Sequence, residues 1–499
     1  MTQFLANSSL TYGDPSRRPT CPHYWLRSIT ALAFAAFFTQ LLFATQLKAE
    51  SNDLPNIIFV MADDLGYGDL GCFGQQKIST PNLDQMAQEG MRLTDFYAGC
   101  TVCAPSRCVL MTGLHTGHCF IRGNARDNLR PSDVTVAEVL KAAGYQTALM
   151  GKWGLGHEGS NGVPTRQGFD YFYGYLDQGH AHNYYTTFLM RNEERVALKN
   201  VPLNEDESGK GVAKEKVEYS HDLIMEEALA FVDRAAKKDA PFFLYLSLTI
   251  PHANNQAGDK GMEVPDYGQY ADKDWPEPQK GHAAMISRMD RDLGTLFAQL
   301  KQDGIDDNTL VIFTSDNGPH KEGGNDPDFA DSNGPLQGIK RSLHEGGIRV
   351  PTIVRWPGHV KADSESDFAG AFWDVMPTLA AVAGVSKEVP AGIDGISFLP
   401  TITGKGEQPQ HDYLYWAFYE QGGAQAIRQG DWKAIQQPIN TPVRLYNLQS
   451  DLGEEHDLAA DHPEKVKAMT KRMAAAYTPS ERWKFPTPKA KKNNPKGAK

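Results

Sequence analysis

Four short apolar runs, each ending at a charged or amide side chain, constrain the fold of this chain most. They cover residues 56–61, 146–150, 241–250 and 309–315. Runs of this length without alternation are typical of strands that are buried on both faces of a parallel sheet. Segments with helical character lie between them, and the last, residues 283–300, carries one apolar stripe. The alternation predicts an α/β fold built on an open, mostly parallel sheet. A further strand is expected at 91–97, and Thr135 and Glu138 make a capping box for a helix that ends near Gly144.

The side chains at the ends of these runs are candidate ligands. Asp63 and Asp64 follow the first run, Lys152 the second, His252 the third, and Asp316 and Asn317 the fourth. Ligands bind at the carboxyl edge of an open α/β sheet, so we expect these side chains to meet there. By itself, a doubled aspartate after a strand is more often a turn or a helix cap. As a metal site, the oxygen donors favour Ca2+, with Mg2+ as the alternative, over zinc.

A second constraint is the stretch 103–113, which reads Cys-Ala-Pro-Ser-Arg-Cys-Val-Leu-Met-Thr-Gly. Pro105 suits the first turn of a helix, and Gly113 ends it. Residue 103 then lies at a helix N-terminus, where free N–H groups favour an anion such as sulfate. Cys100 and Cys103 would also suit a redox pair or one end of a disulfide.

With the Ser-Asp-Asn-Gly string at 315–318 and the signature at 338–351, this stretch resembles the type I sulfatases, and the resemblance covers about residues 54–475. It implies an alkaline-phosphatase-like fold, with a mixed, mostly parallel sheet sandwiched by helices. It also implies that Cys103 is oxidised to formylglycine, whose hydrate is the nucleophile. A formylglycine-generating or sulfatase-maturating enzyme is then a required partner.

The resemblance also implies roles for individual side chains. Asp63, Asp64, residue 103, Asp316 and Asn317 hold the metal, Arg107 polarises the hydrate, Lys152 and Lys340 bind the sulfate, and His252 donates a proton. The expected activity is hydrolysis of a sulfuric ester, on a sulfated carbohydrate or an aryl sulfate, with a sugar favoured. A phosphodiester or phosphonate hydrolase of the same superfamily and a non-catalytic binder of sulfated glycans are the alternatives.

One position departs from the family pattern. Type I sulfatases commonly show Gly-Lys-Trp-His-Leu-Gly, whereas this chain has Gly154 in place of the histidine. His157, His180 or His182 is a candidate replacement or substrate-binding residue, although each is more often an ordinary surface or pocket histidine. The aromatic segment 168–185 around them suits either stacking on sugar rings or a core. Residues 253–282, rich in Gly and Pro, are expected to form a loop over the pocket.

The ends of the chain predict export. Arginines before the apolar run 29–43 make residues 1–49 a signal peptide; an uncleaved anchor is the alternative, but the run is short for a membrane span. A periplasmic or secreted location and a bacterial source are favoured, without a stable membrane span. The predicted domains are a catalytic domain at 50–400, a small α+β subdomain with an antiparallel sheet and a helix at 401–483, and a basic, disordered tail at 484–499.

The net charge limits the possible partners of the chain, and the cysteine count limits its possible disulfides. The formal net charge of −11 argues against nucleic acid as a partner, and it means that an anionic substrate must be bound by a local cluster of cations. After export and modification of Cys103, four cysteines remain: Cys72, Cys100, Cys108 and Cys119. They allow three disulfide pairings or none.

Overall fold

The computed structural model describes residues 54–486, so the predicted leader and nearly all of the predicted tail lie outside the described residues. Four parallel strands lie side by side at its centre, in the order β11 (Thr309–Ser315), β1 (Asn56–Ala62), β10 (Phe242–Ser247) and β4 (Gln146–Lys152). They are the four apolar runs predicted from the sequence, and they are buried on both faces. Their carboxyl ends therefore meet at one edge of the sheet.

Six further strands complete this sheet within the described residues. β5 (Tyr171–Tyr175) continues the parallel set beyond β4. Beyond β11 lie β12 (Thr352–Arg355), β2 (Met91–Leu93) and β13 (Ser364–Ser366), of which only β12 runs antiparallel to the central strands. Beyond β5 lie β6 (Phe188–Arg191), which is antiparallel to it, and β7 (Glu194–Ala197), which is antiparallel to β6. The mixed, mostly parallel sheet is confirmed.

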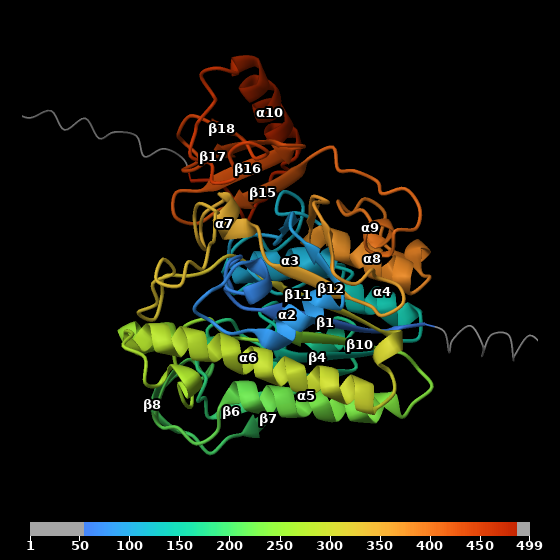
Figure 1. Cartoon of the computed structure of the whole chain (residues 1–499), viewed down its shortest axis with the longest axis vertical. Coiled ribbons are helices and arrows are strands. Elements are labelled where there is room, and N and C mark those ends of the chain that lie inside the picture. The colour runs from blue at the N-terminus through green and yellow to red at the C-terminus, as the bar shows by residue number, and fades with distance from the viewer. Residues whose placement is uncertain (1–53, 487–499) are drawn as a thin grey trace, which may run out of the picture. The chain divides into compact units, whose positions relative to one another are not determined.

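Helices cover both faces of the sheet (Figure 1). Alternate residues of β1 point to opposite faces: Ile57, Phe59 and Met61 to one, Ile58 and Val60 to the other. The first face packs against α3 (Cys103–Thr112), α4 (Val136–Ala142) and α8 (Val375–Val382). The second packs against α2 (Pro81–Gln88), α5 (Ser220–Ala236) and α6 (Glu277–Gln302).

Two predicted elements have different limits in the structure. The single strand expected at 91–97 is wrong, because a turn at Thr94 and Asp95 divides it into β2 and β3 (Phe96–Tyr97), which belong to different sheets. The last helix of the second face begins at Glu277, not at residue 283, because Pro278 occupies its first turn. The segment expected to be a long loop therefore ends earlier, and it contains two 3-10 turns, Asn255–Lys260 and Gly268–Tyr270.

The C-terminal part forms the predicted small antiparallel sheet, with β15 (Leu414–Phe418), β16 (Ala424–Gln429), β17 (Trp432–Gln436) and β18 (Arg444–Asn447). Successive residues of these strands also point to opposite faces of the sheet. Trp416 and Ile435 join the core on the α3 face of the large sheet, whereas Tyr415 and Ala434 pack against α10 (Pro463–Ala475). The small sheet and its helix confirm the predicted fold class.

Several short elements lie in loops. The hairpin strands β8 (Val201–Glu205) and β9 (Gly211–Glu215), like β6 and β7, come from a segment in which the sequence predicted no structure. The others are β14 (Gly370–Ala371), α7 (Glu345–Ile348) and α9 (Leu399–Thr403). The five cysteines of residues 54–486 carry free thiols. None of the helices in this part of the chain has the length and apolar character needed to cross a membrane.

Candidate active site

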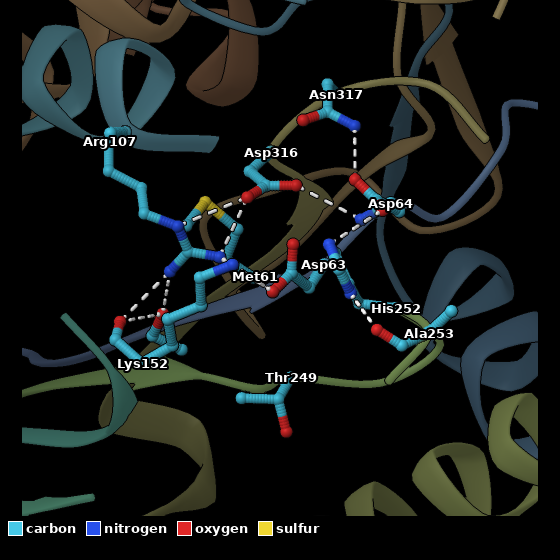
Figure 2. Close-up of polar contacts among 12 residues, drawn as sticks. Met61, Asp63, Asp64, Arg107, Lys152, Thr249, His252, Ala253, Asp316 and Asn317 are labelled. Atoms are coloured by element: carbon cyan, nitrogen blue, oxygen red, sulfur yellow. Dashed lines mark hydrogen bonds and ion pairs between the residues drawn. The ribbon is translucent and has the colours of Figure 1, made fainter. Parts of the chain in front are cut away.

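The ends of β1 and β11 bring four oxygen-bearing side chains together, as predicted. Asp63 and Asp64 follow β1, and Asp316 and Asn317 follow β11. The Asp64 backbone N–H donates to Asp316 Oδ1 at 3.1 Å, and Asn317 Nδ2 donates to Asp64 Oδ1 at 2.7 Å. These contacts, drawn in Figure 2, hold the two strand ends against each other. The doubled aspartate is thus part of a buried cluster.

Three cations face these carboxylates. Lys152 Nζ, at the end of β4, lies 2.6 Å from Asp63 Oδ2, and Lys340 Nζ lies 2.7 Å from Asp64 Oδ2. Arg107, on α3, donates from Nε and Nη2 to Asp316 Oδ2 at 3.1 and 2.8 Å. The Arg107 Nη1 group also donates to the Lys152 carbonyl at 3.0 Å, which ties α3 to the end of β4. Each carboxylate of the cluster thus has its own cation.

Burial and charge shift the pKa values in this cluster in opposite directions. Burial alone would raise the pKa of Asp63, but Lys152, His252 and Arg107 lower it well below its usual range. Burial, with the nearby Asp63, raises the pKa of Asp316 to about 7 despite Arg107. The pKa of Lys340 is raised because Asp64 and Glu322 outweigh its burial. The protein cations therefore stabilise the carboxylates unequally.

Two oxygen atoms in the cluster fit a further cation. Asp63 Oδ1 and Asn317 Oδ1 are buried and have no hydrogen-bond partner among the described residues. Most buried acceptors have a hydrogen-bond partner, so two unpaired ones in a single charged cluster call for an explanation, and a bound ion is one. One ligand atom from each of Asp63, Asp64, Cys103 and His252 also lies within 4.8 Å of the others. The residues present thus fit a divalent cation held by oxygen atoms.

Cys103 is the first residue of α3 and is buried. Burial raises the pKa of its thiol to about 12, so the unmodified side chain is protonated at neutral pH and is a weak nucleophile and ligand. It lines a cavity of about 370 Å³ together with Lys340, His252, His182, Gly154 and Gln178. The cavity gives a ligand access to the charged cluster.

His252 is a hydrogen-bond acceptor in this arrangement. Its Nδ1 lies 2.7 Å from the Ala253 carbonyl and must donate to it, so Nε2 accepts from Lys340 Nζ at 3.0 Å. Burial, with the nearby Lys340, lowers its pKa well below the usual range. The proton of this pair is therefore on Lys340 in the ground state.

The three candidate histidines occupy different places. The His182 ring stacks on His252 with a centroid distance of 4.3 Å, and His157 lines the same cavity through the loop after β4. His180 is buried instead against Tyr175 and Phe188, with Nε2 2.9 Å from Thr186 Oγ1, and lines a neighbouring cavity of about 410 Å³. Much of the aromatic segment is core, because β5 buries its rings there.

Two charged residues at the site were not predicted from the sequence. Glu322 lies in the loop after β11, and its carboxylate contacts Lys340 Nζ at 3.2 Å and Arg341 Nη2 at 2.5 Å. The side chain of Arg341 lines the cavity. No strand end or family motif contains Glu322, so only the path of the loop reveals it. The loop expected over the pocket contributes Asn255 to the cavity lining.

Comparisons with known proteins show which family the chain is similar to. The family model described as Sulfatase matches residues 55–385, and a model described as N-sulphoglucosamine sulphohydrolase, C-terminal, matches residues 339–478. Human arylsulfatase A is 33% identical over 83% of this chain and 86% of its own length. Mouse N-acetylgalactosamine-6-sulfatase is 31% identical over 78% and 73%. The solved structure of Ps i-CgsB in complex with k-i-k-neocarrahexaose has a TM-score of 0.71 and 29% identity, covering 87% of this chain and 95% of that one.

Proposed function

The chain belongs to the sulfatase family of enzymes, which hydrolyse sulfate esters, and from that premise we propose that it removes sulfate from a sulfated carbohydrate at residue 103. One observation carries the proposal. Lysine, arginine and carboxylate side chains from the ends of β1, β4 and β11, from α3 and from the loop before α7 gather at the cavity that Cys103 lines. Outside such a cluster, a chain of this negative charge would repel an anionic ester.

We assign the metal site to Asp63, Asp64, Asp316, Asn317 and residue 103, and the ion to Ca2+. The unpaired Asp63 Oδ1 and Asn317 Oδ1 support this assignment, as does the all-oxygen character of the side chains available. His252 is an unsuitable ligand, because its Nε2 already accepts a hydrogen bond from Lys340. The cationic and anionic side chains of the site balance one another, so a divalent ion would give the site the net positive charge that a sulfate requires.

Sulfatases generally use formylglycine and a divalent metal, and Cys103 is the residue that we expect to be modified. When present, the hydrated aldehyde supplies the nucleophilic hydroxyl, and the metal polarises it and the sulfate oxygens. Because Cys103 is buried in the folded chain, we infer that the maturation enzyme acts on it before the chain folds. Export through the leader would then deliver the protein to an extracytoplasmic compartment.

The charged side chains of the site bind the sulfate, position residue 103 and donate a proton. Lys152 and Lys340 neutralise the sulfate oxygens, and their contacts with Asp63 and Asp64 fix both ammonium groups before substrate arrives. Arg107 holds Asp316 and the end of β4 in place around residue 103. The pair formed by Lys340 Nζ and His252 Nε2 supplies the proton for the departing alcohol. The roles of His157, His180 and His182 remain predictions.

The test measures the mass of the peptide that contains residue 103 and the rate of sulfate release. The tryptic peptide of residues 93–107 from exported protein should have the mass of an aldehyde in place of the thiol at residue 103. The same protein should release inorganic sulfate from a sulfated sugar, and kcat/KM for a matched phosphate ester should be far lower. Protein that carries the aldehyde and bound Ca2+ but releases no sulfate would refute the proposal. A higher kcat/KM for the phosphate ester would favour the phosphohydrolase alternative.

A further inference from the structure

The carboxamide of Gln178 is unpaired beside the Cys103 cavity. Its Nε2 and Oε1 atoms are both screened from solvent, and neither has a hydrogen-bond partner among the described residues. An amide that is buried with its donor and its acceptor both unsatisfied is rare, and it calls for an explanation. Gln178 also lines the cavity that contains Cys103, His182 and Lys340. A ligand in that cavity is therefore a natural partner for the carboxamide.

Gly154 makes the room for this side chain. Its backbone φ is +77°, and a Cβ atom at this position would lie 2.4 Å from Gln178 Nε2 and 2.8 Å from Gln178 Cδ. The Gly154 N–H donates to the Leu176 carbonyl at 3.0 Å, which holds the chain before Gln178 against the end of β4. Any larger residue at 154 would have to displace the carboxamide. The glycine and the glutamine thus form one unit in the cavity wall.

We propose that the Gln178 carboxamide binds a hydroxyl group of the sugar, close to the carbon that carries the sulfate. A hydroxyl both donates and accepts a hydrogen bond, as a carboxamide does, whereas a sulfate only accepts. The lysines already provide the charge that the sulfate needs. The terminal torsion of a glutamine is broad, so a small rotation turns the amide toward the cavity. This assignment rests on the proposed action on a sulfated carbohydrate.

The experiment compares two substrates in the mature, full-length enzyme. One is the best substrate in a set of monosulfated galactose and N-acetylgalactosamine sugars, and the other is 4-nitrophenyl sulfate, which has no hydroxyl. In Gln178→Ala, the ratio of kcat/KM for the sugar to that for the aryl ester should fall about five- to tenfold. The loss should be mainly a higher KM for the sugar, because the hydroxyl is held equally before and during reaction. Gln299→Ala on α6 is the matched glutamine control, because that side chain donates to the Leu229 carbonyl.

Coupling to Gly154 provides a second readout. Gly154→Ala should displace the carboxamide and reduce the ratio as Gln178→Ala does, and the double variant should lose no more than Gln178→Ala alone. Gly159→Ala controls for backbone strain, because Gly159 has a φ of +74° but nothing within 4 Å of its Cβ position. An equal loss in Gly159→Ala, or losses that multiply in the double variant, would contradict the coupling.

The remaining outcomes also decide the question. An unchanged ratio in Gln178→Ala overturns the hydroxyl contact, whatever happens to the absolute rates. If wild-type enzyme hydrolyses the aryl ester but none of the sugars, the contact falls with the carbohydrate assignment. If it releases sulfate from neither substrate despite an aldehyde at residue 103, the proposed function itself fails.

Discussion

Replacing Lys433 with methionine should destabilise the fold at the junction between the two sheets. Lys433 Nζ lies 2.6 Å from Glu345 Oε1 and 3.1 Å from Glu454 Oε1, and all three side chains are buried. Glu345 begins α7, which follows the loop that carries Lys340, so the ammonium fastens β17 to that loop. Methionine keeps the aliphatic volume but leaves two buried carboxylates without their shared cation.

The expected loss of unfolding free energy follows from the burial of the three side chains. Removing one partner of a buried pair costs roughly 3–5 kcal/mol, because the remaining charge is uncompensated. With an unfolding entropy of roughly 2.1 cal/mol/K per residue over residues 54–486, this corresponds to a fall in Tm of about 3–5 °C. The matched control is Lys237→Met, which breaks an exposed i,i+4 pair with Asp233 and should cost about 0.5 kcal/mol or less.

The loss should also depend on pH. Burial raises the pKa of Glu454 from about 4.5 to about 7 in the folded state. A carboxyl with a raised pKa stabilises the fold below the unfolded value and loses that contribution as the pH rises through the folded value. Without Lys433, ionised Glu454 has lost its cation, so the fall in Tm should be larger near pH 8 than near pH 5.5. Thermal unfolding followed by circular dichroism measures both. A Tm within ~1 °C of wild type, or a loss that is equal at both pH values, would refute this reasoning.

Four further predictions concern the active site. Lys152→Ala should lower kcat/KM for sulfate release by about 10²–10³-fold, because it removes a preorganised charge and leaves Asp63 without its lysine. Lys141→Ala, at an exposed ion pair, is the control. Equal kcat/KM values for the two variants would exclude a role of Lys152 in sulfate release. Chelation with EGTA should abolish activity and lower Tm, and added Ca2+ should restore both. In Asp64→Asn, added Ca2+ should restore less of the activity and of the Tm. A Tm that EGTA does not change would argue against a bound ion. Cys103→Ser should stop turnover and retain one sulfo group, seen as added intact mass, and sustained turnover would contradict a need for the aldehyde. His182→Ala should change the pH–rate profile of the enzyme, whereas His180→Ala should chiefly lower Tm, because its Nε2 contacts Thr186 Oγ1 and the carbonyl of Phe188, the first residue of β6; the reverse pattern would exchange their roles.

Local sequence patterns were sufficient for the elements whose signal lies in neighbouring residues. The apolar run at 56–61 could be recognised as a buried strand because its length and composition leave few alternatives. The helix at α4 was predicted from Thr135 and Glu138, and the structure contains the reciprocal capping contacts. Family motifs added Lys340, which no local pattern would have selected. The structure brings it to Asp64, 276 residues away in the chain.

Predictions failed where long-range contacts decide the backbone. The strand expected at 91–97 divides at Asp95, which is paired with Arg349 and Arg428, residues far along the chain. Glu322 and Gln178 lie in loops without periodicity, so nothing nearby in the sequence indicates that they reach the cavity. Their positions depend on the packing of other segments.

The amino-acid sequence by itself determined the four central strands and the chemical groups that follow them, because both can be recognised from the apolarity and spacing of neighbouring residues. Only the tertiary structure decided that β11, β1, β10 and β4 lie in this order, which cation pairs with which carboxylate, and that His182 faces the cavity while His180 does not. The physical reason is separation in the chain: Asp64 and Asp316 touch across 252 residues, and no local preference encodes such a contact.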